Sequence, residues 1–194
     1  MSLFWTNAEL GFDHVLDWQA YDHILFLIVL IAAYNFDNWK RIILLVTLFT
    51  IGHTISLVLG AYKLLPISGS TAEFLIPITI LIAALFNIFT ANKVSSHGRY
   101  RILYGTTLLF GLIHGVGFSN YFNIISGNLG SKIFQLTGFV IGIEIAQIII
   151  VIIVLLLGFI GQTFLRFSKR DWILVVSSIV IGMVIPMIIE NKIW

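Results

Sequence analysis

Six long apolar stretches are the feature that most constrains the fold of this chain. Each has about the 20 residues that a helix needs to cross the hydrocarbon core of a bilayer. The predicted membrane spans are 15–34, 42–62, 73–91, 102–122, 134–167 and 172–189. We therefore predict an all-α, polytopic integral membrane bundle of about six transmembrane helices, with residues 1–194 forming a single transmembrane domain.

The composition supports the membrane assignment and limits the kinds of metal ligand that the chain can offer. Hydrophobic residues make up 59% of the chain and charged residues 10%, whereas roughly a quarter of the residues in a soluble domain are charged. The chain has no cysteine, which excludes disulfides, thiolate zinc sites and iron-sulfur clusters. A bound metal must then be held by imidazole, carboxylate or backbone oxygen. The net charge of +2 comes from basic residues in short loops, which argues against nucleic-acid binding.

Basic residues in the loops predict the orientation of the bundle. The connections after the first, third and fifth spans carry eight of them: Lys40, Arg41, Lys93, Arg99, Arg101, Arg166, Lys169 and Arg170. The opposite side carries Lys63, Lys132 and Lys192. Cytoplasmic loops are enriched in lysine and arginine, so both termini are predicted on the non-cytoplasmic side. In a Gram-negative bacterium this means the inner membrane, with the termini toward the periplasm.

Ionisable residues inside the spans are the candidate functional site. They are Asp22, His23, His53, His114 and Glu144. Burying such a group in lipid costs about 2.5 to 3.5 kcal/mol even on a lenient insertion scale, so intramembrane ionisable groups are functional candidates by default. A single buried histidine could equally be a core residue bonded to a neighbouring helix. Five such residues on four spans favour one shared site.

The predicted topology places these residues at a similar depth. His53 lies nine residues before the outer end of its span, and His114 lies eight residues before the end of its own. At about 1.5 Å per residue, both lie roughly 12 to 14 Å below the outer surface. Asp22 and His23 reach the same layer, whereas the length of the fifth span leaves the depth of Glu144 less certain. The prediction is a polar well that opens outward.

Other polar residues have two readings. His14, Asp17 and Glu73 lie near the predicted mouth, where His14 is a candidate metal ligand and Asp17 and Glu73 are candidates to support the ligands from behind, unless all three are simply solvated. Gln147, one turn from Glu144, either orients a ligand or only packs between helices. His97 belongs to a polar stretch and is interpreted as a solvated loop residue.

Five segments in order resemble the HupE/UreJ family of membrane proteins, specifically its second branch. They are 21–27, 49–57, 73–76, 110–118 and 142–147. The resemblance implies six to eight helices and a link to nickel or cobalt supply for hydrogenase and urease. It also implies similarity to nickel/cobalt permeases, whose histidine and Asp-His signature corresponds here to His14 with Asp22 and His23. The spacing of His14 from Asp22 is longer than in the permeases, which leaves the role of His14 open.

Three functional hypotheses remain at this stage. Imidazoles and carboxylates without sulfur suit a divalent nickel, cobalt or zinc ion, which the protein would transport or supply. For transport, Asn87 is the only obvious polar residue on an inner exit path. The alternative is an intramembrane zinc hydrolase acting on a lipid or lipid-anchored substrate, with Glu144 or Asp22 as general base. The third is a metal-free accessory or scaffold protein whose polar network fixes helix packing.

Overall fold

The computed structural model describes residues 3–62, 64, 69–92, 97–126 and 129–192. These residues form helices and short connections, with no strand among them. The helices are α1 (Leu3–Leu16), α2 (Asp22–Ile31), the 3₁₀ helix η1 (Phe36–Asn38), α3 (Trp39–Ala61), α4 (Gly69–Thr90), α5 (His97–Ser126), α6 (Leu129–Thr163) and α7 (Lys169–Glu190). The predicted all-α fold class is confirmed.

Four helical segments of the described chain are long and apolar enough to cross a membrane. They are Phe36–Gly60, Gly69–Thr90, Gln135–Thr163 and Lys169–Glu190. Two shorter apolar segments accompany them, Asp22–Ile31 and Leu103–Phe118. The protein is therefore an integral membrane protein, and these segments coincide with the last five predicted spans and part of the first.

The first predicted span, 15–34, is not one continuous helix. α1 ends at Leu16, residues 17–21 form a turn, and α2 begins at Asp22. The side chain of Asp17 accepts a hydrogen bond from the backbone N–H of Gln19 at 2.8 Å, and such local bonds compete with helix formation. With ten residues, α2 is about 15 Å long, half the thickness of the hydrocarbon core. It is a half-helix that begins inside the bundle.

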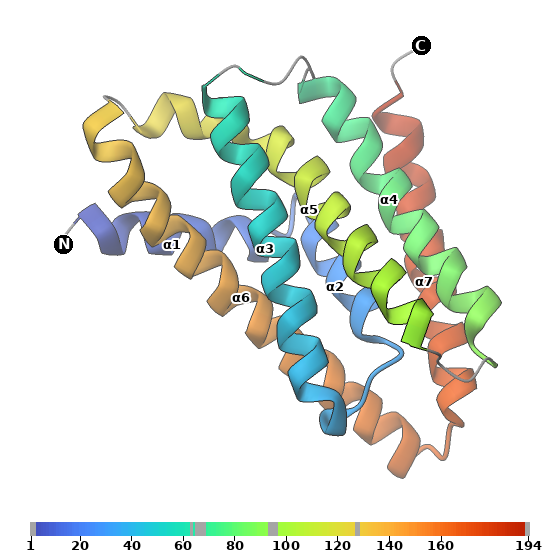
Figure 1. Ribbon diagram of the computed structural model, residues 1–194. Coiled ribbons are helices and arrows are strands. Elements are labelled where there is room, and N and C mark those ends of the chain that lie inside the picture. The colour runs from blue at the N-terminus through green and yellow to red at the C-terminus, as the bar shows by residue number, and fades with distance from the viewer. Residues whose placement is uncertain (1–2, 63, 65–68, 93–96, 127–128, 193–194) are drawn as a thin grey trace.

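Apart from α1 and the half-helix α2, the helices run between two ends of the bundle (Figure 1). At one end α2 connects to α3 and α6 connects to α7, and we call this the α2–α3 end. α3, α4, α5, α6 and α7 extend from it toward the opposite end, while α1 lies across α6. This arrangement brings the last turn of α1 to the point where α2 starts.

Glycines let two helix pairs approach to backbone contact. α1 crosses α6 where a Cβ added at Gly11 would overlap the carbonyl of Phe139, and one at Gly142 would overlap the carbonyl of Ala8. Small residues allow this kind of packing between membrane helices. The crossing holds α1 against the bundle and fixes the position of its C-terminal turn.

A second set of glycines joins α3 to α5. A Cβ at Gly111 would overlap the carbonyl of Phe49, and one at Gly115 would overlap the carbonyl of His53. Gly52 of α3 makes the reciprocal approach to Leu108. Because these glycines adjoin His53 and His114, the same contact that packs the helices also sets the separation of the two histidines.

Candidate metal centre

Four histidines from four helices meet inside the bundle. His14 comes from the last turn of α1, His23 from the first turn of α2, His53 from α3 and His114 from α5. The ring of His23 lies at the centre of the group, with its centroid 4.7 Å from that of His14, 5.7 Å from His53 and 5.3 Å from His114. One ligand atom from each of His14, His23 and His53 lies within 4.8 Å of the other two. We call these four residues the histidine cluster.

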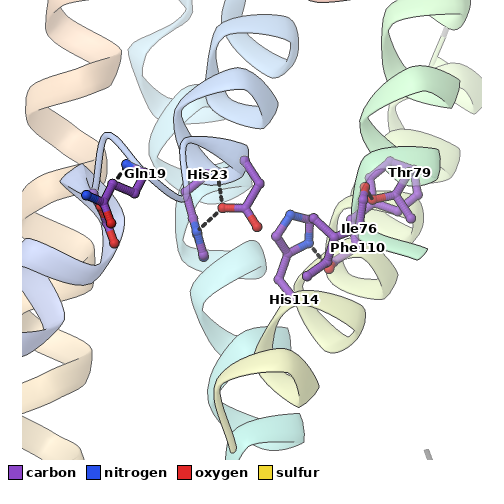
Figure 2. Close-up of polar contacts among 8 residues, drawn as sticks. Gln19, His23, Ile76, Thr79, Phe110 and His114 are labelled. Atoms are coloured by element: carbon purple, nitrogen blue, oxygen red, sulfur yellow. Dashed lines mark hydrogen bonds and ion pairs between the residues drawn. The ribbon is translucent and has the colours of Figure 1, made fainter. Parts of the chain in front are cut away.

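Hydrogen bonds at Nδ1 determine which ring nitrogens are free (Figure 2). His114 Nδ1 lies 2.8 Å from the carbonyl oxygen of Phe110, an acceptor only, so Nδ1 carries the hydrogen. His23 Nδ1 lies 2.9 Å from Asp22 Oδ1, and an ionised carboxylate likewise requires Nδ1 to donate. In the neutral form of both rings, Nε2 then presents a lone pair.

The free nitrogens of the cluster are buried without partners. Nε2 of His14, His23, His53 and His114 makes no hydrogen bond, and neither does Nδ1 of His53. Buried polar atoms in proteins are almost always satisfied, so a group of them in one place calls for an explanation. For His23 and His114 these atoms are lone pairs, which a cation satisfies.

Asp22 supports the cluster through His23. Its Oδ1 accepts hydrogen bonds from both the ring Nδ1–H and the backbone N–H of His23, at 2.9 Å and 2.7 Å. A carboxylate behind an imidazole fixes its tautomer and orientation and makes its other nitrogen a better metal ligand. The Asp-His pair at the start of α2 therefore has the structure of a metal ligand with its orienting partner.

Phenylalanine rings enclose the histidine cluster. Phe118 and Phe139 stack on each other, and the Phe118 centroid lies 4.0 Å from that of His14. On the side of α2, Phe26 and Phe49 stack at 4.8 Å and lie 5.5 Å and 5.1 Å from the His114 ring. His53, His114 and His23 are buried among these rings. The environment is of low polarity, which strengthens electrostatic interactions inside it.

Glu144 and Gln147 form a different network, between α6 and α3. Both oxygens of Glu144 accept hydrogen bonds, one from the hydroxyl of Thr47 at 2.7 Å and the other from Thr50. Thr50 Oγ1 also lies 2.9 Å from the side-chain amide of Gln147, which is completely buried. The amide oxygen Oε1 of Gln147 faces this hydroxyl, so the single hydrogen of Thr50 is donated either to Glu144 or to Gln147, and Gln147 Nε2 has no partner among the described residues.

The structure sorts the predicted site residues into three sets. His14, His23 and His53 come together, with Asp22 and His114 adjoining them. Glu144 and Gln147 lie in the threonine network instead. Asp17 and Glu73 are exposed, and the side chain of His97 lies outside the described residues. Sequence reasoning missed Thr47 and Thr50, although their spacing of three residues matches that of Glu144 and Gln147 on the facing helix.

We expect Thr50→Val to lower the stability of the protein by about 1 to 3 kcal/mol, because it leaves Glu144 and the buried Gln147 amide short of a partner. Thr54→Val is the matched control on the same helix. The Thr54 hydroxyl donates to the carbonyl of Thr50 within α3, so the control is expected to change stability by less than about 1 kcal/mol. Thermal unfolding of both variants in detergent checks this, and equal losses would contradict the assigned network.

Comparison with known proteins adds one match. A family model described as HupE / UreJ protein matches residues 1–191, which include the histidine cluster and Asp22. No curated protein and no solved structure matches the chain. The match confirms the resemblance that the five sequence segments indicate.

Proposed function

Because the chain belongs to the HupE/UreJ family, we propose that it binds a divalent nickel, cobalt or zinc ion at the histidine cluster and serves in the transport or supply of that ion. The buried Nε2 atoms without partners carry the proposal. His14, His23 and His53 supply ligand atoms within reach of one ion, and Asp22 orients His23. His114 adjoins His23 and supplies a fourth imidazole.

The donor set selects the class of metal. Imidazole nitrogens suit nickel, cobalt, copper and zinc, whereas magnesium and calcium prefer oxygen ligands. The cluster offers imidazoles, and its carboxylate is engaged with His23. The family points to nickel and cobalt within this class. Zinc fits the same ligands.

The hydrolase alternative is less well supported. A zinc hydrolase needs a carboxylate or similar base beside the metal-bound water. Glu144 has both oxygens engaged by threonines and is absent from the metal-ligand group, while Asp22 holds His23. A metal-free scaffold is also disfavoured, because a structural network would satisfy the ring nitrogens that are left without partners. Metal transport or supply therefore remains the best-supported function.

The cellular location follows from the basic residues in the sequence. Eight of the eleven lysines and arginines lie in the connections that follow the first, third and fifth predicted spans, and this bias supports a cytoplasmic side there. We place the protein in a bacterial inner membrane with both termini and the mouth of the site toward the periplasm. Accessibility of thiols introduced at exposed positions would test this, because the natural chain has no cysteine.

The direct test of the proposed function is metal binding followed by uptake. The purified protein in detergent is titrated with nickel, cobalt and zinc, and we expect about one ion per chain, held by one set of imidazoles. Vesicles containing the protein are then loaded from outside with the ion that binds. Uptake supports transport, and binding without uptake supports supply to a partner protein. No binding of any of the three ions would overturn the proposal.

Asp22→Asn is expected to weaken metal binding by about 10- to 100-fold, the usual effect of losing a carboxylate behind a metal-binding histidine. The asparagine retains the volume of the side chain and loses its charge. Titration calorimetry measures the change, and Asp17→Asn is the control, since Asp17 is exposed in the preceding turn. If Asp22→Asn binds the metal as tightly as the wild type, Asp22 does not contribute to the metal site.

A further inference from the structure

A cavity of about 500 Å³ lies between α2, α4 and α5. The rings of Phe26 and Phe110 separate it from His114 of the histidine cluster. Phe26 and Phe110 line its inner end, and Phe26 also packs against His114. The volume lies within the usual range for small-molecule and cofactor sites, about 300 to 1,000 Å³. Asn87, which the sequence offered as the polar residue on an inner exit path, also lines this cavity, and its Nδ2 donates to the backbone carbonyl of Val29 at 2.7 Å.

Polarity changes along the cavity. Apolar side chains of α2 and α4 form its walls, including Val29, Leu30 and Ile82. Its other end carries Arg41 from the start of α3 and Lys169 from the start of α7. Both basic residues lie at helix starts that belong to the α2–α3 end, where α2 connects to α3 and α6 connects to α7 (Figure 1). The inner part of the cavity is thus lined mainly by apolar side chains, and its mouth carries two positive charges.

The cavity wall offers a hydrogen-bond donor. The hydroxyl of Thr107 is buried, with 1% of the residue exposed, and makes no hydrogen bond. A buried hydroxyl without a partner is costly, and a ligand carbonyl in the cavity would satisfy it. Thr107 precedes Phe110 by three residues on α5, so its hydroxyl lies one turn from the phenylalanine at the inner end of the cavity.

The cavity also reaches the surface that faces the bilayer. Ile82 and Phe86 of α4 line it and are 51% and 37% exposed. In a membrane protein, exposed apolar side chains in the middle of a spanning helix contact lipid. An acyl chain can therefore enter along α4 without crossing the polar mouth.

We propose that this cavity binds one phospholipid with an anionic headgroup. The phosphate lies near Arg41 and Lys169, and an acyl chain extends between α2, α4 and α5 toward Phe26. The described residues that line the cavity include no carboxylate, so the positive charges of Arg41 and Lys169 at the mouth repel a hydrated divalent cation and attract an anion. This distinguishes the cavity from the histidine cluster, whose nitrogens suit a cation.

The test compares lipids of different charge on the purified full chain. Phosphatidylglycerol is expected to bind more tightly than phosphatidylcholine by native mass spectrometry and to raise the unfolding temperature more. In the double variant Arg41→Gln/Lys169→Gln, the preference should fall by about five-fold for each charge removed. Lys40→Gln is the matched control, because Lys40 adjoins Arg41 but does not line the cavity. Equal binding of the two lipids, or equal losses in the double variant and the control, would overturn the proposal.

A single introduced thiol provides a second readout. The natural chain has no cysteine, so Thr107→Cys places one thiol at the cavity wall. Phosphatidylglycerol should protect it from a hydrophilic maleimide, while phosphatidylcholine protects it less. Rapid labelling that phosphatidylglycerol does not slow would show a water-filled cavity and overturn the lipid assignment. Nickel or cobalt binding by the labelled protein shows separately whether the histidine cluster is intact.

Discussion

Gly115→Ala is expected to destabilise the protein by about 3 kcal/mol, near the upper end of the usual cost of overpacking a close contact. The added Cβ would overlap the carbonyl oxygen of His53 and the hydroxyl of Ser56, so α3 and α5 must separate. Backbone atoms cannot rotate out of the way as a flexible side chain can. Because His53 lies at the point of overlap, metal affinity should fall together with stability.

Gly105→Ala is the matched control for this prediction. Gly105 lies on the same helix, α5, and a Cβ added there would meet no atom within 4 Å. Alanine is the better helix former by up to about 1 kcal/mol, so the control is expected to be neutral or slightly stabilising. Thermal or denaturant unfolding in detergent measures both variants. If Gly115→Ala is as stable as Gly105→Ala, α3 and α5 do not pack as described.

His53→Ala is expected to lower nickel, cobalt or zinc affinity by roughly 100-fold or more, since losing even an orienting partner of a ligand costs 10- to 100-fold. Both ring nitrogens of His53 are buried without hydrogen-bond partners, so the wild-type side chain has no bond that alanine breaks. Because the side chain is fully buried, alanine also leaves a cavity that lowers stability, so affinity and stability are both measured. Titration calorimetry measures the affinity.

His97→Ala is the control for His53→Ala. His97 begins α5, seventeen residues before His114 on the same helix, which corresponds to about 25 Å along the helix axis. It is expected to leave metal affinity unchanged. His53→Gln keeps more of the side-chain volume and separates the effect of the lost ligand from that of a cavity. A folded His53→Gln protein with full metal affinity would exclude His53 as a ligand.

The sequence anticipated the helices because their signal is local. Runs of apolar residues such as 42–62 and 172–189 coincide with α3 and α7 to within a few residues. The prediction of one continuous span failed at 15–34, because the polar residues Asp17, Gln19 and Asp22 interrupt the apolar run and the helix breaks at residues 17–21. There a single side-chain bond, from Gln19 N–H to Asp17, accompanies the end of the helix, and a hydropathy pattern cannot register it.

The candidate site was anticipated in part for a similar reason. The depth of a residue in the membrane follows from its position along a straight helix. This rule placed His23, His53 and His114 at a similar depth. Depth says nothing about the face of the helix, and for that reason Glu144 was grouped with the histidines although it bonds to Thr47 and Thr50. His14 belongs to the cluster because α1 is a separate helix that packs across α6, an arrangement that residue depth could not predict.

By itself, the sequence determined that the chain is an α-helical membrane protein with histidines and acidic groups that lipid cannot accommodate singly. These properties depend on composition and on spacing along one helix. The tertiary structure alone decided which of these groups share a site, because that depends on helix rotation and on the glycine contacts at Gly11, Gly52, Gly111, Gly115 and Gly142. Those contacts bring backbones from distant parts of the chain together, and with them four imidazoles whose free nitrogens have no hydrogen-bond partner among the described residues.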